Sequence, residues 1–335
     1  MLDIKEIHEL SAGVEYHLKQ LENVMPLLRE VKESLELLKR SREGEFLWQL
    51  HLLKREVQEL KAHLRRYGLQ EASKYEGELA ALRDELGSDR WPSAVDQDMI
   101  CSTEEQFQER AKGILDIVVG EDLDNRTFLD FGCGAGHVAM LAQERGATTV
   151  GYDIEKKWPS DLPLFTCDFE TVRKHGIFEI ILLHDVLDHI EVVDPVTALQ
   201  QVRTVMNRES RVYIRTHPWC SRHGGHVYED LNKAFLHLVF DDVELTRICG
   251  SQAMHNVKVS RPLDTYRYWF KTAGLEIRSE IPIRKEVEPF FLEPSYANQR
   301  LRQKWDDPLQ MVQDLEIEFV EYMLQIPEIP PATIL

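Results

Sequence analysis

Long apolar runs are absent from this sequence of 335 residues, because no stretch holds the about 18 consecutive apolar residues that a membrane-spanning helix needs. Cysteine is scarce: five residues stand in no paired spacing, which indicates reduced thiols in the cytoplasm instead of a disulfide framework. The N-terminal segment lacks the pattern of a signal peptide. We therefore expect a cytoplasmic protein without a membrane partner.

Positive charge is also in short supply, with 40 Lys and Arg against 58 Asp and Glu and a net charge of -18. Residues 91–335 hold 40 of the acidic and 25 of the basic side chains. Proteins that bind nucleic acid neutralise phosphates with a basic face. We therefore do not expect a nucleic-acid partner, and small molecules, sugars or protein side chains are the better candidates.

A strand, a tight turn and a helix are predicted over residues 126–145. The turn holds three closely spaced glycines, and Asp130 comes just before it. Asp153 lies 21 residues after Gly132, at the end of the next predicted strand, where a carboxylate can accept hydrogen bonds from ribose hydroxyls. This βαβ pattern predicts a cofactor that contains a nucleoside.

The glycine spacing disfavours a dinucleotide. The third glycine, Gly136, comes one position early for the G-x-G-x-x-G fingerprint, and His137 stands where that fingerprint has glycine. Asp130 suits a cationic amine better than an anionic pyrophosphate. With no second catalytic domain visible, an NAD-linked enzyme is the weaker hypothesis.

At these residues the sequence resembles the class I S-adenosylmethionine-dependent methyltransferases, whose first motif has the same acidic residue before G-x-G-x-G. The resemblance covers roughly residues 114–326. It implies an α/β, Rossmann-like seven-stranded sheet, mostly parallel with the last strand antiparallel, and S-adenosylmethionine as cofactor. The residues that it assigns to the cofactor site are Asp130, Gly132, Cys133, Gly134, Gly136, Asp153, Ile154, Asp168, Phe169, His184 and Asp185.

Two of these positions have an open alternative. In the family an acidic residue after the third strand receives the adenine amino group and its neighbour packs on the ring, which implies those roles for Asp168 and Phe169. Asp168 could equally cap the helix that begins near Glu170.

The most apolar predicted strand, residues 177–183, leads into a stretch that resembles the "hDvLeHi" segment of many small-molecule methyltransferases. In a helical turn, His184 with Asp188, or Asp185 with His189, would share a face at a spacing of four. An imidazole oriented by a carboxylate is a good general base. Alternatively, these residues only cap the turn and line the methionine end of the cofactor.

Residues 216–228 are the most unusual segment. His217, Cys220, His223 and His226 recur every three residues after the predicted fifth strand. Three interpretations stay open: an acceptor loop with a catalytic histidine and a guiding Arg222, a transition-metal site, or a structural loop. The spacing matches no metal signature, so no metal is expected. The candidate catalytic residues are His189, His217 and His223.

Heptad-like apolar spacing within residues 1–86 forms two seams out of phase, with Pro26 inside the first. It predicts a coiled coil that makes a homo-oligomer or docks to a larger assembly; a helical hairpin packed on its own domain is the alternative. Trp91 in the connector is either part of a cofactor lid with Ile100 or a packing anchor. The predicted organisation is a coiled coil over 1–88, a connector and leading helix over 89–120, the methyltransferase domain over 121–326 with an insertion near 217–260, and a proline-rich tail over 327–335. Residues 228–245 of the insertion are expected to form one helix, and the alternation over 275–283 and 314–324 predicts the sixth and seventh strands.

The predicted function is in-line methyl transfer to a small molecule, sugar or protein group. The alternative is a structural or assembly protein that retains the fold, with the coiled coil as its working part. Residues 216–228 resemble segments of methyltransferases encoded by marine and cyanobacterial phages, which implies a viral origin and a location in the host cytoplasm or the virion.

Overall fold

The computed structural model describes residues 72–96, 101–158, 164–190, 194–229, 231–241, 244–245 and 261–328. The chain divides into two compact units, Met1–Arg83 and Asp84–Leu335, a boundary close to the predicted one. Both coiled-coil seams, Ile100, residues 246–260 of the insertion and residues 329–335 of the tail lie outside the described residues. Helix α3 spans Ala72–Gly87.

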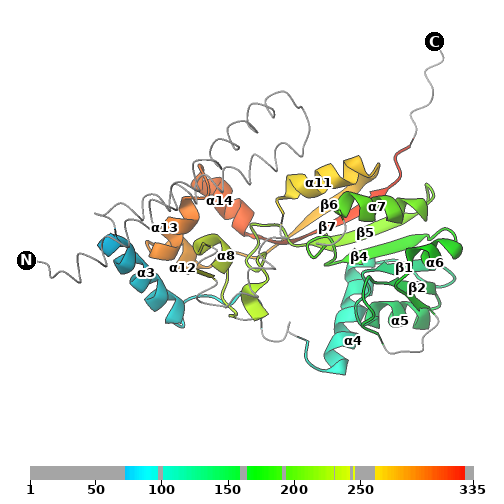
Figure 1. Cartoon of the computed structure of the whole chain (residues 1–335), viewed down its shortest axis with the longest axis horizontal. Coiled ribbons are helices and arrows are strands. Elements are labelled where there is room, and N and C mark those ends of the chain that lie inside the picture. The colour runs from blue at the N-terminus through cyan, green and yellow to red at the C-terminus, as the bar shows by residue number, and fades with distance from the viewer. Residues whose placement is uncertain are drawn as a thin grey trace, which may run out of the picture. The chain divides into compact units, whose positions relative to one another are not determined.

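A seven-stranded sheet in the order β3-β2-β1-β4-β5-β7-β6 organises the second unit (Figure 1). The strands are β1 Thr127–Phe131, β2 Thr148–Tyr152, β3 Phe165–Thr166, β4 Ile180–His184, β5 Arg211–Thr216, β6 Glu276–Arg284 and β7 Ile317–Gln325. Strand β7 runs antiparallel to both β5 and β6, and the other neighbours are parallel. The predicted mostly parallel sheet with an antiparallel last strand is confirmed.

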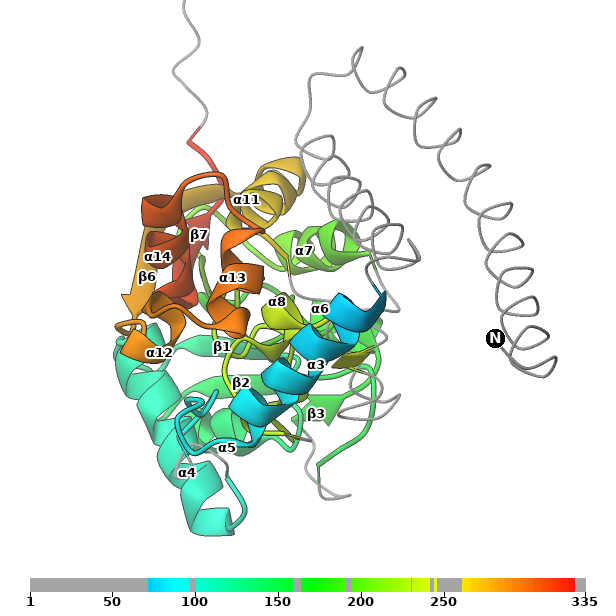
Figure 2. The same cartoon turned by 90° about the vertical axis from the view of Figure 1, so that its left-hand side faces the viewer.

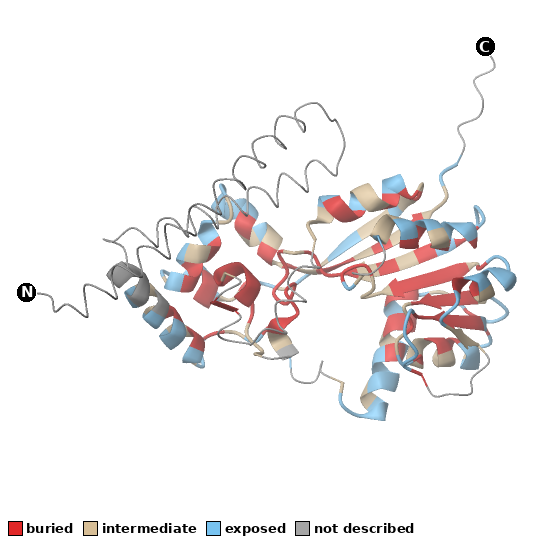
Figure 3. Cartoon of the chain, in the orientation of Figure 1, coloured by how far each residue is buried: buried red, intermediate tan, exposed pale blue. Residues whose placement is uncertain are grey.

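Strands β1 and β4 lie in the middle of the sheet, and their apolar side chains are buried on both faces of the sheet. The four apolar residues of β4 are each at most 2% exposed, the pattern of a central parallel strand. Leu129 of β1 lies opposite Val150 on one side and Ile181 on the other. Figure 3 shows these strands as the most continuously buried part of the sheet.

Helices cover both faces of the sheet (Figure 1). One core joins the sheet to α6 Phe169–Lys174, α7 Pro195–Thr204 and α11 Leu263–Thr272. The core on the other face joins it to α5 His137–Glu144 and the π-helical turn η2 Ile114–Val119, which continues α4 Glu104–Gly113. Thr103 begins α4 with a capping box to Gln106. The helix predicted after the glycine turn is confirmed as α5, and the helix predicted to begin near Glu170 is confirmed as α6.

A second group of short helices comprises η3 Val227–Glu229, α8 Leu236–Val239, α12 Pro289–Leu292, α13 Tyr296–Arg302 and α14 Pro308–Leu315; Figure 2 shows the last three beside one another. The single insertion helix predicted over residues 228–245 is wrong. Phe235 has a left-handed backbone, with φ of 59°, which no continuing α-helix tolerates.

Trp91 is a packing anchor and not part of a lid. It is 2% exposed, stacks on Phe240 and meets the rings of Phe290 and Phe291. Its indole N–H donates to the Ala234 carbonyl at 3.0 Å, which satisfies the one polar group of the side chain. In the part of the chain that the structure describes, no helix combines the length and apolar character that crossing a bilayer requires.

Candidate functional site

The glycine turn joins β1 to α5 and depends on glycine at specific positions. Gly132 and Gly136 have φ of 83° and 88°, in the left-handed region. A Cβ atom at Gly132 would lie 2.4 Å from the Val186 side chain, and one at Gly136 would lie 2.4 Å from the Phe165 ring. The amides of Gly132 and Cys133 both donate to the Tyr152 carbonyl, which ties the turn to β2.

Asp130 lies in β1, two residues before the turn, and is 4% exposed. Burial raises the pKa of its carboxyl to about 7, against the opposing effect of a hydrogen bond from the Ala139 amide. Its Oδ2 atom has no hydrogen-bond partner among the described residues. A buried carboxyl with a free oxygen is prepared to bind a cationic group.

Asp153 follows β2 and faces the same turn. Its Oδ2 accepts a hydrogen bond from the Gly134 amide at 2.9 Å, and its Oδ1 accepts one from the Glu155 amide at 3.1 Å. Each carboxylate oxygen has a second lone pair that a ribose hydroxyl can use. The next residue, Ile154, leaves an apolar side chain 58% exposed beside this carboxylate.

The other predicted cofactor residues have structural partners. Asp168 caps α6: its carboxylate accepts hydrogen bonds from the Glu170 and Thr171 amides and from the Thr171 hydroxyl. Phe169 is 9% exposed, its ring packed on Phe131 and Tyr152. The structure therefore supports the capping alternative for Asp168, and a contact of either residue with adenine stays a prediction.

Helix α4 lies against the glycine turn, as expected for a leading helix. Phe107 stacks on the His137 ring with centroids 5.0 Å apart, and Glu104 pairs with the same imidazole at 3.2 Å. Farther along α4, Arg110 donates to Asp185 at 2.9 Å. Arg110 had no distinguishing signal in the sequence.

A cluster of acidic and imidazole side chains forms where β4 and β5 end. These strands are parallel neighbours, so the residues that follow them meet at one edge of the sheet. The cluster comprises His184, Asp185, Asp188 and His189 after β4 and His217, His223 and His226 after β5.

The pairs within this cluster differ from the predicted ones. Asp185 contacts His184 Nδ1 at 3.1 Å and His217 Nε2 at 3.3 Å, while Asp188 lies 3.6 Å from His226 Nε2. The expected pairs at a spacing of four do not form, because Asp185 has φ of 54° and the chain turns there instead of continuing as a helix.

The pKa values of two touching histidines diverge. Burial would lower the pKa of His217, but the Asp185 carboxylate outweighs it and the pKa lies above its ordinary value. Burial and the neighbouring His217 hold the pKa of His223 well below its usual range. Two adjacent titratable groups with separated pKa values are a common arrangement for acid–base chemistry.

Two members of the unusual loop lie outside the cluster. Arg222 is 3% exposed and forms an ion pair with Glu288, and a guiding role toward an acceptor stays a prediction. Cys220 is buried, and burial together with the Asp314 carboxylate raises the pKa of its thiol. The set of three histidines and Cys220, which one of the three interpretations treats as a metal site, is therefore not brought together.

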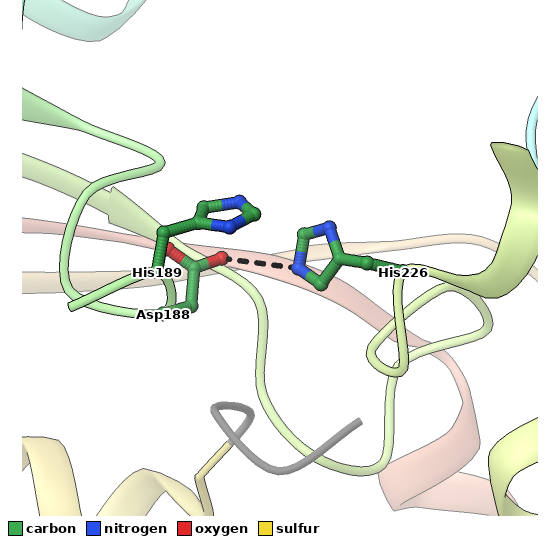
Figure 4. A group of neighbouring side chains, drawn as sticks. All are labelled: Asp188, His189 and His226. Atoms are coloured by element: carbon green, nitrogen blue, oxygen red, sulfur yellow. Dashed lines mark ion pairs between the residues drawn. The ribbon is translucent and has the colours of Figure 1, made fainter. Parts of the chain in front are cut away.

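The structure assembles two other sets with ligand atoms close enough for a metal ion. The oxygen and nitrogen atoms of Asp188, His189 and His226 lie within 4.8 Å of one another, and so do those of Asp185, Asp188 and His217 (Figure 4 shows the first set). No local sequence pattern predicts that Asp188 and His226 meet, since they are far apart along the chain.

A family model described as a methyltransferase domain matches residues 103–280. No curated protein sequence matches the chain.

Two solved structures illustrate the similarity. An S-adenosylmethionine-dependent methyltransferase from Archaeoglobus fulgidus is 14% identical over 66% of this chain and 97% of that one, with a TM-score of 0.41. Magnesium protoporphyrin IX methyltransferase from Synechocystis, with bound SAH, is 14% identical over 75% of this chain and 100% of that one, with a TM-score of 0.38.

Proposed function

The chain belongs to the methyltransferase-domain family, and we propose that it transfers a methyl group from S-adenosylmethionine to an oxygen or nitrogen of a small molecule, a sugar or a protein side chain. The observation that carries the proposal is the glycine turn between two carboxylates, Asp130 and Asp153. Such a site suits a ligand that has a cationic amine at one end and a ribose at the other.

The hydrogen-bond acceptors present match the parts of this cofactor. The free oxygen of Asp130 would accept a hydrogen bond from the methionyl amine, and Asp153 would accept them from the ribose hydroxyls. Ile154 offers an exposed apolar surface to adenine. When bound, S-adenosylmethionine supplies the methyl group and keeps the bonding electron pair at its sulfur.

The acceptor must lose a proton if it is a hydroxyl or an ammonium group, and His189, His217 and His223 are the proposed bases. His217 and His223 are 7% and 6% exposed, which keeps water away from the reacting atoms. His217 is oriented by Asp185 on one side and by His223 on the other. His184 and Asp185 would border the methionine end of the cofactor.

Calorimetric titration with S-adenosylmethionine tests the cofactor site. The Asp130→Asn variant should bind at least about tenfold more weakly, because a charge-assisted hydrogen bond is lost. Asp306→Asn, which changes an exposed carboxylate, is the matched control and should bind like the unaltered chain. Equal affinity of all three proteins would refute the assignment.

Turnover requires a second assay, which measures the release of S-adenosylhomocysteine with a panel of hydroxyl, amine and peptide acceptors. Release that depends on one acceptor class supports an enzyme. Cofactor binding without release for any acceptor favours the alternative, a structural or assembly protein that retains the fold.

We also propose that residues 1–86 hold the chain in an oligomer or dock it to a larger assembly. The support is the heptad spacing alone. Light scattering on the full chain should give a molar mass of more than one protomer. A charged residue in a seam, as in Leu28→Lys or Leu53→Lys, should lower that mass. A monomeric full chain would exclude self-association. Phage origin stays a prediction.

A further inference from the structure

We propose that Asp188, His189 and His226 bind one divalent transition-metal ion of the Zn²⁺ type, at the edge of the sheet where β4 and β5 end. Their ligand atoms already lie within 4.8 Å of one another. If the three side chains move toward one another, two imidazole nitrogens and a carboxylate oxygen can each lie at the about 2.0–2.2 Å from the ion that zinc ligands adopt. Figure 4 shows the His226 ring pointing its nitrogen at the Asp188 carboxylate.

Unsatisfied polar atoms support a ligand at this place. Asp188 is fully buried and His226 is 5% exposed. Within the described ranges, neither Asp188 Oδ1 nor His226 Nε2 has a hydrogen-bond partner. The His226 nitrogen is 3.6 Å from Asp188 Oδ2, which is too far for a good hydrogen bond. Buried polar atoms are nearly always paired, so these two indicate a missing partner.

The backbone holds His226 in an uncommon conformation. Its φ is 51°, in the left-handed region that residues other than glycine seldom adopt. The preceding Gly225 is pressed against His237, where an added Cβ would lie 2.5 Å away. The surrounding loop therefore fixes the direction of the His226 ring, a feature that accompanies functional sites.

The third ligand leaves the site accessible. His189 is exposed, whereas the other two are buried, so ions can reach the site from the side of His189. Three protein ligands leave at least one coordination position for water or another oxygen, as in catalytic zinc sites. Two imidazoles with one carboxylate favour Zn²⁺ and similar ions over Mg²⁺, which prefers oxygen ligands.

Neighbouring groups orient the ligands. The His217 amide donates to Asp188 Oδ2 at 3.3 Å, which fixes the carboxylate and leaves Oδ1 for the ion. Partners of this kind set the geometry of metal sites. Of the four residues His217, Cys220, His223 and His226 that recur every three positions, only His226 belongs to this set, so its spacing along the chain matches no metal signature.

A role in catalysis rests on the proposed function, but ion binding does not. The open position would hold an oxygen of the methyl acceptor near the bases His217 and His223. His189 then serves as a ligand and not as a base.

The test uses the untagged full chain, freed of metal with EDTA and titrated with Zn²⁺ by calorimetry without S-adenosylmethionine. We expect one ion per chain and little binding of Mg²⁺. His189→Gln and His226→Gln should each weaken Zn²⁺ binding by about 100-fold or more, the upper range for the loss of a supporting group. His175→Gln, at an exposed histidine of the C-terminal cap of α6, is the matched control.

A spectroscopic measurement distinguishes a variant that has lost the metal site from one that has misfolded. The Co²⁺ form of the unaltered chain should show visible d–d absorption, and His189→Gln, at an exposed position, should lose it while its thermal unfolding stays unchanged. No binding of Zn²⁺, or equal binding by the unaltered chain and both ligand variants, overturns the inference. Zn²⁺ binding by a chain that fails to bind S-adenosylmethionine supports the inference and refutes the proposed function.

Discussion

The imidazoles of His217 and His223 meet nitrogen to nitrogen, with His217 Nδ1 2.7 Å from His223 Nε2. At this distance one nitrogen carries the proton and the other presents its lone pair. Asp185 lies 3.3 Å from the other nitrogen of His217. His223 Nδ1, at the far end, has no hydrogen-bond partner in the described part of the chain. We expect the acceptor's proton to enter at this free nitrogen.

Replacing either histidine should slow turnover without loss of the cofactor. For His217→Gln and His223→Gln we expect kcat to fall by about 10²–10⁴-fold, the usual contribution of a positioned base. Affinity for S-adenosylmethionine should stay within a factor of about two, because Asp130 and Asp153 are unchanged. Kinetics with the identified acceptor and calorimetry give the two numbers. His175→Gln is the control, and cofactor loss in the histidine variants would contradict these roles.

Asp130→Asn should stabilise the cofactor-free chain at high pH. The pKa of the folded-state carboxyl, about 7, exceeds its ordinary value of 3.8, so the folded state retains its proton longer than the unfolded state. The stability that Asp130 contributes therefore falls as pH rises from 3.8 to about 7 and stays low above it.

The expected gain in the free energy of unfolding is about 2–4 kcal/mol at pH 8, and it should vanish near pH 4. Urea unfolding of both proteins at the two pH values measures it. A variant that is less stable than the unaltered chain at pH 8 would show that the carboxylate is well accommodated when charged.

Gly136→Ala should lower the free energy of unfolding more than Gly176→Ala. Both glycines have left-handed backbones, with φ of 88° and 91°, so each alanine costs about 1–2 kcal/mol. Only at Gly136 does the new Cβ meet a neighbour, the Phe165 ring at 2.4 Å; at Gly176 nothing lies within 4 Å. Urea unfolding should show the larger loss for Gly136→Ala, and calorimetry should show weaker cofactor binding for that variant alone. Equal losses would mean that the Phe165 ring moves aside freely.

Asp168 variants separate capping from cofactor binding. Asp168→Ala should lower the free energy of unfolding by about 1 kcal/mol, and Asp168→Ser should restore most of it, because serine also caps helices. If the Asp168 carboxylate only caps α6, neither variant changes the affinity for S-adenosylmethionine. An affinity that falls in both variants, stable or not, would assign Asp168 to adenine. Thermal unfolding and calorimetry on the same preparations distinguish the two roles.

The sheet could be predicted because patterns of neighbouring residues in the sequence specify its strands and turns. The apolar run of β4 and the alternation in β6 and β7 specify strands, and the glycines after β1 specify a tight turn. Helix ends were likewise marked by nearby residues such as Thr103, Asp168 and Gly87. The insertion was mispredicted since the left-handed backbone of Phe235 leaves no mark in the pattern of apolar residues.

The residues proposed to bind the cofactor, namely Asp130, the three glycines and Asp153, could be predicted from their spacing along one βαβ unit. The pairing of carboxylates and histidines at the ends of β4 and β5 could be learned only from the folded chain. His217 pairs with Asp185, and Asp188 with His226, because β4 and β5 are neighbours in the sheet and because Asp185 and His226 turn the chain with positive φ. Such contacts depend on strand order and loop conformation, and residues tens of positions apart cannot encode them in a local pattern.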